Sequence, residues 1–410
     1  MSETSPFPSV DEQMKAILRG ADEVFPEDEL RKKLERSRKT GKPLRVKLGV
    51  DPTAPDLTLG NAVPLWKLRT FQDLGHKAIV IIGDYTARVG DPSGRNKLRP
   101  SLDEAQVDAF AQTYVDQLDC ILDTSDDKLE VHRNGTWFAG MTFMEVMALA
   151  GRMTLAQMIE RDDFSKRYRE QTPISLHEFM YPLMQGWDSV VVKADVELGG
   201  SDQRFNLLVG RQFQKQEGQE PQSLVVNPLL AGLDGTKKMS KSAGNYIGVT
   251  EAPAEQFGKA MSAPDALLRD WLTCFTDTSQ ERIEVLCNTE VTHPRQAKEE
   301  LGKGIVRRYW GDAAAEEAAA GFRKVFTEKK LPDDMPVFTV PADGIGVLQL
   351  FVELGFAKSN GEARRLIKQG AAKLDDVKIE DPEATIAAAD LPADGGVLKV
   401  GKRRFARLVQ

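Results

Sequence analysis

Lysines gather in a short polar segment, TKKMSKSAGN (236–245), that follows a predicted strand and a turn at Asp234-Gly235. Lys237, Lys238 and Lys241 share this segment with serines and glycines. A loop that carries several ammonium groups suits a mobile clamp on a polyphosphate. A charged run of this kind is also typical of an ordinary solvated loop, so the segment alone leaves both interpretations open.

A second pattern that suits phosphate binding lies in LRVKLGVDPTAPDLTLGN (44–61), where an apolar strand runs into a turn. The spacing predicts a helix that begins near Gly60 and has Pro64 in its first turn. Free N–H groups and the positive end of the helix dipole would face a ligand there, and Thr53, Thr58 and Asn61 add side-chain donors. The sequence contains neither GxGxxG nor GxxxxGK[ST] at this point, so a simple capped helix is an equal alternative.

A polar stripe follows in SLHEFMYPLMQGWDSV (175–190). Ser175 and Glu178 have the spacing of a capping box and predict a helix that begins there. Tyr181, Gln185 and Asp188 then fall on one face of this helix, among Met and Trp. Solvated faces usually carry Lys and Glu, so the stripe indicates a pocket wall. We also expect Pro182 to kink the helix.

Two more polar segments follow predicted strands. GGSDQ (199–203) places Asp202 and Gln203 at the carboxyl end of a strand, where a carboxylate commonly accepts a hydrogen bond from a ribose hydroxyl. The loop YTARVGDPSGRNKLRP (85–100) contains Asp91, Arg95 and Arg99. Asp91 suits a substrate ammonium group, although it equally suits a turn before Pro92.

The elements that must position these residues are strands and helices in alternation. Strand 44–50, helix 60–74 and strand 78–84 form a βαβ unit and predict a parallel sheet. Residues 10–40 and 103–170 read as helices outside that sheet. The second group carries so many Met, Leu and Val that we expect part of it to be the interface of a two-fold dimer, with packing inside the domain nearly as plausible.

Composition excludes several classes of protein. With 41% hydrophobic and 29% charged residues, no long apolar run and no basic-then-apolar leader, the chain of 410 residues reads as cytoplasmic and not membrane-bound. The three cysteines form no CxxC pair, and the four histidines lie far apart. A disulfide framework, a structural zinc and His-based catalysis are therefore disfavoured.

Charge is unevenly distributed, because residues 346–410 carry 11 Lys and Arg against 9 Asp and Glu, whereas the whole chain has a net charge of −7. Ser359 is predicted to cap a helix in this tail, which follows a Pro- and Asp-rich linker. A basic module on an acidic body favours a polyanionic partner. The expected phosphate-backbone footprint consists of Arg364, Arg365, Lys368, Lys402, Arg403 and Arg404.

Taken together, the motifs resemble those of bacterial tyrosyl-tRNA synthetases, which are class I aminoacyl-tRNA synthetases. The resemblance spans nearly the whole chain and rests on DPTAPDLTLGN (51–61), GDPSGR (90–95), YPLMQGWD (181–188), GGSDQ (199–203) and KMSKS (238–242). It implies an α/β fold with a Rossmann-like catalytic domain at 1–250, with the helical insertion and dimer contact at about 103–175. A helical tRNA-contacting domain at 251–330, a linker at 331–344 and a small α+β RNA-binding domain at 345–410 would follow.

The family activates tyrosine with Mg-ATP to give tyrosyl-adenylate and pyrophosphate, and then transfers tyrosine to the 3′ end of its tRNA. The resemblance therefore implies tyrosine, ATP, Mg²⁺ and tRNA as partners, with no tightly bound cofactor, no metal site of the protein's own and no DNA. It implies that tyrosine is held by Asp91, Tyr181, Gln185, Asp188 and Gln203, with Asp188 on the phenol. It implies that ATP is held by Asp51, Thr53, Thr58, Gly60, Asn61, Asp202, Lys238 and Lys241, of which Thr53, Thr58, Lys238 and Lys241 are the expected catalytic residues.

Two positions depart from the family pattern. Thr58-Leu59-Gly60-Asn61 stands where the family usually has His-x-Gly-His, and Lys47 stands where many relatives have a tyrosine near the substrate phenol. Two alternatives therefore stay open beside an active tyrosine enzyme. One is the related tryptophan enzyme, which Asp188 and the tail module disfavour. The other is a tRNA-binding protein that has lost adenylation through the change at Thr58.

Overall fold

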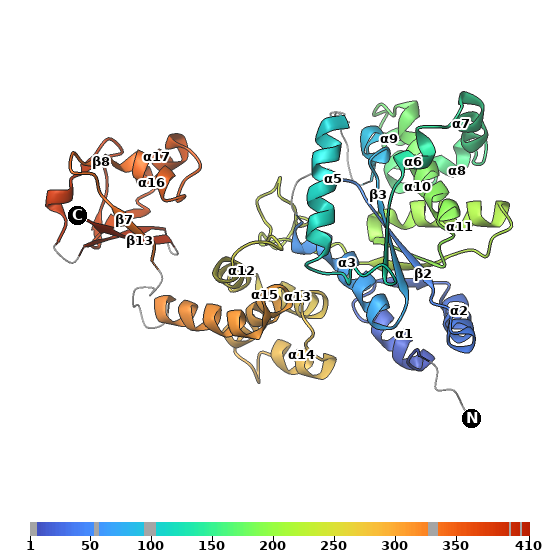
Figure 1. Ribbon diagram of the computed structural model, residues 1–410, viewed down its shortest axis with the longest axis horizontal. Helices are drawn as coiled ribbons and strands as arrows, with labels where there is room; N and C mark the ends of the chain where they lie inside the picture. Colours follow the sequence, from blue (N-terminus) through green and yellow to red (C-terminus); the bar gives the residue numbers. More distant parts are fainter. Residues whose placement is uncertain (1–5, 53–56, 94–103, 327–334, 393–394, 402–403) are drawn as a thin grey trace. The chain divides into compact units, whose positions relative to one another are not determined.

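The computed structural model describes residues 6–52, 57–93, 104–326, 335–392, 395–401 and 404–410. The predictions for Thr53, Arg95, Arg99, Lys402 and Arg403 lie outside these residues. The chain divides into two compact units, Met1–Ala319 and Ala320–Gln410 (Figure 1). None of the described helices is long and apolar enough to cross a bilayer.

A six-stranded sheet in the order β1-β6-β5-β2-β3-β4 organises the first unit. Its strands are β1 (Glu23–Phe25), β2 (Arg45–Val50), β3 (Lys77–Ile82), β4 (Leu129–Arg133), β5 (Val196–Gly200) and β6 (Ser223–Asn227). All neighbours pair in parallel except β1, which runs antiparallel to β6. The chain leaves β2 for β3 on one side and later returns to β5 on the other side. The predicted parallel α/β sheet is therefore present, and its switch point lies between β2 and β5.

Two of these strands were not predicted. β1 interrupts the expected helical region 10–40, which forms α1 (Val10–Leu18) and α2 (Glu27–Thr40). β4 interrupts the expected helical insertion and pairs with β3 at the edge of the sheet. Both strands are short and partly exposed, so they lack the continuous apolar run that marked the central strands.

Helix α3 (Leu59–Asp73) follows β2 and has Thr58 as its N-cap. We expected Pro64 in the first turn of α3, but it lies further inside the helix. Pro182, by contrast, was expected inside a helix and lies near a helix start. A 3₁₀ turn, η1 (Leu176–Phe179), carries the predicted Ser175–Glu178 capping box, and α10 (Met180–Val191) begins after it. Pro182 is therefore in the first turn of α10, where its missing N–H costs little and no kink is needed.

The insertion between β3 and β5 is mainly helical. It contains α4 (Thr86–Val89), α5 (Glu104–Leu118), α6 (Gly135–Phe138), α7 (Phe143–Ala150), α8 (Leu155–Ile159) and α9 (Asp162–Arg169). Several large apolar side chains are exposed here or just beyond it, namely Phe143, Met144, Met147, Leu155, Tyr168 and Leu176. After the insertion, α10 packs along α11 (Arg204–Gln216), with η2 (Ser201–Gln203) between β5 and α11 (Figure 1).

The helical segment predicted at 251–330 forms α12 (Pro253–Ala260), η3 (Asp265–Leu267), α13 (Leu268–Phe275), α14 (Gln280–Cys287) and α15 (Pro294–Phe326). Gly311 breaks α15 with φ 85° and ψ 174°, a conformation that favours glycine. Buried side chains such as Trp271 and Leu301 join the same hydrophobic core as β2 and α3. This shared core explains why most of the segment belongs to the first unit.

The second unit contains a five-stranded sheet in the order β10-β9-β12-β13-β7 and a two-stranded sheet of β11 and β8. Ser359 caps α17 as predicted, because its hydroxyl accepts from the Glu362 N–H. The buried core includes Leu350, Phe351 and Leu398. The elements are β7 (Val337–Thr339), β8 (Ile345–Gly346), α16 (Val347–Glu353), α17 (Asn360–Lys368), β9 (Ala372–Leu374), β10 (Val377–Lys378), β11 (Thr385–Ile386), η4 (Ala388–Asp390), β12 (Gly396–Val400) and β13 (Arg404–Val409).

Candidate active site

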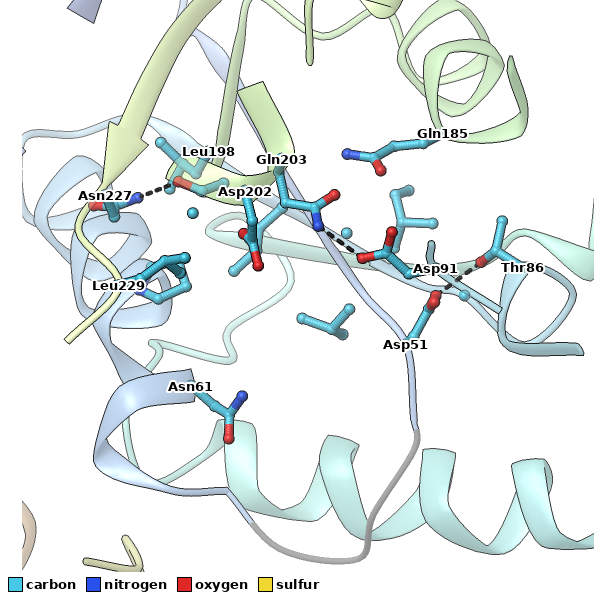
Figure 2. Close-up of a pocket in the computed structure, with 18 of the residues that line it drawn as sticks. Asp51, Asn61, Thr86, Asp91, Gln185, Leu198, Asp202, Gln203, Asn227 and Leu229 are labelled. Carbon is cyan, nitrogen blue, oxygen red and sulfur yellow. Dashed lines mark hydrogen bonds between the residues drawn. The ribbon is translucent and has the colours of Figure 1, made fainter. Parts of the chain in front are cut away.

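A cavity of about 250 Å³ lies at the carboxyl ends of β2, β3, β5 and β6, beside the switch point of the sheet. The start of α3 and the polar face of α10 complete its walls (Figure 2). Ten of the residues predicted from the sequence line it, namely Asp51, Gly60, Asn61, Asp91, Tyr181, Gln185, Asp188, Asp202, Gln203 and Lys238. Residues from six separate segments of the chain are thus brought to one site.

Asp188 forms the deep end of this cavity, with 3% of its surface exposed. Its Oδ1 accepts from the Trp137 indole N–H at 3.0 Å, and its Oδ2 accepts from the Asn134 amide at 3.3 Å. Burial raises the pKa of Asp188 to about 7, while the charge of Lys47 and these two hydrogen bonds oppose the shift. The carboxylate is therefore held by two donors and still faces the cavity, where it can accept from a ligand hydroxyl.

Tyr181 stands on the same face of α10, where its hydroxyl donates to Asp51 Oδ2 at 2.8 Å. The other oxygen of Asp51 accepts from the Thr86 hydroxyl at 2.8 Å (Figure 2). Burial raises the pKa of Tyr181 well above its usual value, and the nearby Asp51 and Asp91 carboxylates add to this effect. Tyr181 is therefore a neutral donor at physiological pH, and it fixes the carboxylate at the end of β2.

Asp91 and Gln203 are in direct contact in the wall of the cavity (Figure 2). The Gln203 amide donates to Asp91 Oδ2 at 2.7 Å, and the amide and hydroxyl of Ser93 donate to Asp91 Oδ1 at 2.8 and 2.6 Å. Asn206 donates to both Gln203 and Gln185, at 2.8 and 2.9 Å. An anionic group with several fixed amide neighbours suits the ammonium and carboxylate of an amino acid.

The outer end of the cavity is more exposed and is formed by Asn61, Asp202 and Lys238. Lys238 Nζ lies 2.9 Å from Asp202 Oδ2, and its side chain is 56% exposed. Met239, the next residue, is buried against the start of α3, where a Cβ on Gly60 would lie 3.3 Å from its own Cβ. The lysine segment is thus anchored by its methionine at a helix N-terminus, which is a favourable place for phosphate.

Thr58 is engaged in the helix cap. Its hydroxyl donates to Asn61 Oδ1 at 2.7 Å and accepts from the Asn61 N–H at 3.3 Å, and only 2% of the residue is exposed. Neither Thr58 nor Lys241 is among the described residues that line the cavity. Thr53 lies outside the described part of the chain.

The two donors to Asp188 and the residues behind the Asp91–Gln203 pair were not predicted from the sequence. Asn134 and Trp137 directly follow β4, so recognising LEVHR as a strand would have placed them at the same edge of the sheet as the other candidates. Arg161 is 4% exposed, and it contacts Ser93, Asn206 at 3.2 Å and Asp91 at 3.5 Å. Nothing in the local sequence distinguishes it from other arginines of the insertion.

The cavity is suited to orienting bound reactants and not to forming a covalent bond with one of them. Its described lining contains no Cys, Ser, Lys or His arranged as a nucleophile with a base, but it has a buried acceptor at one end and an ammonium group at the other. Such a site accelerates a reaction between two bound substrates by alignment and by stabilising developing charge.

The chain is similar throughout to known proteins. Residues 39–327 match the family model "tRNA synthetases class I (W and Y)", and residues 327–408 match the model "Tyrosine--tRNA ligase SYY-like C-terminal domain". The tyrosine–tRNA ligase of Symbiobacterium thermophilum is 50% identical over 99% of both chains. That of Moorella thermoacetica is 49% identical over 97% of this chain and 95% of its own.

Solved structures agree on the fold. A C-terminally truncated mitochondrial tyrosyl-tRNA synthetase of Aspergillus nidulans matches with a TM-score of 0.63 and 24% identity, covering 78% of this chain and 94% of its own. A tyrosyl-tRNA synthetase of Archaeoglobus fulgidus, solved with L-tyrosine, matches with a TM-score of 0.61 and 23% identity, covering 76% of this chain and 100% of its own. By the family models and the full-length relatives, the chain belongs to the class I tRNA synthetases of the tryptophan and tyrosine group and carries the C-terminal domain of its tyrosine branch.

Proposed function

We propose that this chain is a tyrosine–tRNA ligase: it activates L-tyrosine with ATP, releasing pyrophosphate, and transfers the tyrosyl group to the 3′ end of tRNA-Tyr. The observation that carries the proposal is one cavity with a buried carboxylate at its deep end and Lys238 at its outer end. The relatives at about half identity over nearly the full length support the same activity. We also propose that the reaction takes place in the cytoplasm, since its tRNA substrate is available there.

Tyrosine lies in the deep half of the cavity in this proposal. Asp188 accepts from its phenol, Asp91, Tyr181 and Gln185 hold its ammonium group, and Gln203 holds its carboxylate. A buried acceptor that already has two donors gains a third from tyrosine, whereas phenylalanine would leave it facing an apolar ring. Sites built to hydrogen-bond a hydroxyl reject analogues without it by about 10⁴–10⁵, and this enzyme family is the source of that magnitude.

ATP lies in the outer half. Asp202 accepts from the ribose, Gly60 and Asn61 line the base and phosphate region at the start of α3, and Lys238 stabilises the departing pyrophosphate. We assign Lys241 to the same role from the sequence motif, because it is not among the described residues that line the cavity. Asp51 and Thr53 complete the predicted set. Because the Thr58 hydroxyl is engaged by Asn61, we assign Thr58 to orienting α3 rather than to direct contact. Mg²⁺ arrives with the ATP phosphates as part of the substrate.

ATP–pyrophosphate exchange measured with tyrosine, tryptophan and phenylalanine in turn tests the activity. We expect exchange with tyrosine that exceeds exchange with phenylalanine by several orders of magnitude. Exchange with tryptophan alone would assign the chain to the sister activity. Absence of exchange with all three amino acids, in protein that still binds tRNA-Tyr, would instead favour a tRNA-binding role.

The second unit supplies an RNA surface in this proposal. Arg364, Arg365 and Lys368 are exposed on α17, and Arg364 also pairs with Glu383 at 2.5 Å. Arg365→Ala should weaken tRNA binding and lower the salt dependence of the binding constant by about one counterion, whereas Arg364→Ala should have less effect because Glu383 already neutralises part of its charge. Equal losses would contradict this ranking.

A homodimer is the proposed assembly. The insertion exposes several large apolar side chains, including Phe143 at 76% and Leu176 at 84%, which a subunit contact would cover. Analytical ultracentrifugation should give a dimer, and Met147→Asp should shift it toward the monomer. A monomeric wild-type chain at micromolar concentration would contradict the proposal.

A further inference from the structure

A buried ion pair lies directly behind the polar face of α10. Lys47 on β2 and Glu197 on β5 are partners in the parallel register, and Lys47 Nζ lies 2.8 Å from Glu197 Oε1. Both side chains are 0% exposed, and neither residue is among the described residues that line the cavity. Burying two charges costs several kcal/mol each before their attraction is counted, so a pair in this place calls for a functional explanation.

The pair holds the turn of α10 that carries Asp188. Besides Glu197, Lys47 donates to the Gln185 carbonyl at 2.9 Å and to the Ser189 hydroxyl at 2.8 Å. Glu197 accepts in turn from the Ser189 hydroxyl at 3.0 Å and from the Gln185 side-chain amide at 3.3 Å. The amide of Gln222 also donates to Glu197. Residues on both sides of Asp188 are therefore fixed by one closed network.

The same two charges act on Asp188 with opposite sign. Burial raises the pKa of Asp188 to about 7, and within this balance the positive charge of Lys47 lowers the pKa whereas the negative charge of Glu197 raises it. The other groups that face Asp188 are Trp137 and Asn134 as hydrogen-bond donors, and Tyr181 on the same helix, which the carboxylates of Asp51 and Asp91 influence. His132 lies beside Trp137, with the two ring centroids 6.4 Å apart.

We propose that the Lys47–Glu197 pair is a positioning element of the amino-acid pocket, in which the pair fixes the Gln185–Ser189 turn and Lys47 supplies the charge that keeps the Asp188 carboxylate ionised for the substrate phenol. This inference rests on the proposed role of Asp188 toward tyrosine. It explains how the pocket works with a lysine at position 47, since Lys47 supports the phenol acceptor from behind instead of contacting the phenol.

The roles of Lys47 and Glu197 can be distinguished, because removing each of them should shift the pH at which Asp188 ionises in opposite directions. Lys47→Met removes the positive charge and leaves the negative charge of Glu197, so Asp188 ionises only at higher pH. Glu197→Gln leaves Lys47 unopposed, so Asp188 ionises at lower pH. Both changes loosen the same turn of α10, so a purely structural role would move both variants in the same direction.

The experiment measures kcat/KM for tyrosine by ATP–pyrophosphate exchange from pH 5.5 to 9 in the full-length enzyme, because this parameter reports ionisations of the free enzyme. We expect the acidic limb to move up by about one pH unit in Lys47→Met and down by about one unit in Glu197→Gln. The double variant should return close to the wild-type pH profile with a lower plateau. The KM for ATP should change less than about twofold in all of them.

Lys33→Met is the matched control. Lys33 is also buried, and its Nζ donates to the carbonyls of Asp195 and Pro221, outside the described lining of the cavity. Its loss removes a buried ammonium group without changing the charge beside Asp188, so the acidic limb should stay in place. If Lys47→Met does not fold, Glu197→Gln, which keeps the size of the side chain, decides the question by the sign of its shift alone.

Shifts of the acidic limb in the same direction in both single variants, or no shift in either, would overturn the inference while leaving the proposed function intact. A wild-type enzyme without tyrosine-dependent exchange would instead fail the proposed function itself. The two failures are therefore distinguishable within the same set of measurements.

Discussion

The two ends of the cavity are built in different ways. At the deep end, Asp188 and Tyr181 are buried, and both are held by hydrogen bonds within the protein. At the outer end, Lys238 is more than half exposed, and Asn61 stands on an exposed edge of α3. A fixed, buried acceptor discriminates between similar side chains, because a ligand without a hydroxyl excludes water from the carboxylate and offers it no hydrogen bond in return. Long exposed cations suit a highly charged group that changes shape during the reaction.

The largest expected effect is at the outer end. Lys238→Met should lower the rate of adenylate formation about 100- to 1,000-fold, because it removes a cation that stabilises charge on the leaving pyrophosphate. The KM for tyrosine should remain within about twofold, since the deep end is untouched. Single-turnover measurement of adenylate formation separates the two parameters.

Lys237→Met is the control for this change. Lys237 is the neighbouring exposed lysine and is not among the described residues that line the cavity. Its loss should leave the rate nearly unchanged. A similar loss in both variants would mean that the general positive charge of the segment matters and not the position of Lys238.

The next largest effect is expected at the deep end of the cavity. Asp188→Asn should lower kcat/KM for tyrosine about 10- to 100-fold, which corresponds to the loss of one charge-assisted hydrogen bond. The affinity for ATP should hardly change. Equilibrium binding of ATP together with exchange kinetics for tyrosine checks both statements, and equal damage to the two substrates would contradict the division of the cavity.

The pH dependence should also separate the two ends. Burial raises the pKa of Asp188 to about 7, so its carboxylate is protonated as the pH falls below that value. kcat/KM for tyrosine should therefore fall by up to about tenfold per pH unit below pH 7. The KM for ATP should stay nearly constant over the same range, because Asp188 is not among the residues assigned to ATP. A parallel decline of both parameters would show that the titrating group is not confined to the deep end.

The sequence allowed most of the cavity to be predicted but not what stands behind it. Local signals were sufficient for β2, for the polar stripe on α10 and for GGSDQ, because each combines a strand or helix pattern with an unusual polar residue. The role of Lys47 required the register between β2 and β5, which are 150 residues apart along the chain at the Lys47–Glu197 contact. No local pattern contains that information.

The short strands are the other part of the fold that could not be predicted from the sequence. β4 reads Leu-Glu-Val-His-Arg, with only two apolar residues on a partly exposed edge strand, so its alternating pattern is short and weak. Missing β4 also meant missing Asn134 and Trp137, which orient Asp188. The positions of Pro64 and Pro182 within their helices were predicted wrongly because helix ends depend on the caps and on tertiary contacts.

The smallest expected effect concerns Thr58, which connects the cap of α3 with the outer end of the cavity. Thr58→Ala removes the hydroxyl that pairs with Asn61 and should lower the free energy of unfolding by about 1 kcal/mol. Thr58→Ser keeps the hydroxyl and should leave both stability and exchange activity close to wild type. Denaturant unfolding and exchange kinetics of the two variants are the measurements. If Thr58→Ala instead kept its stability and lost activity more than about tenfold, the hydroxyl would act on ATP directly, because a cap alone stabilises the folded chain and not the transition state.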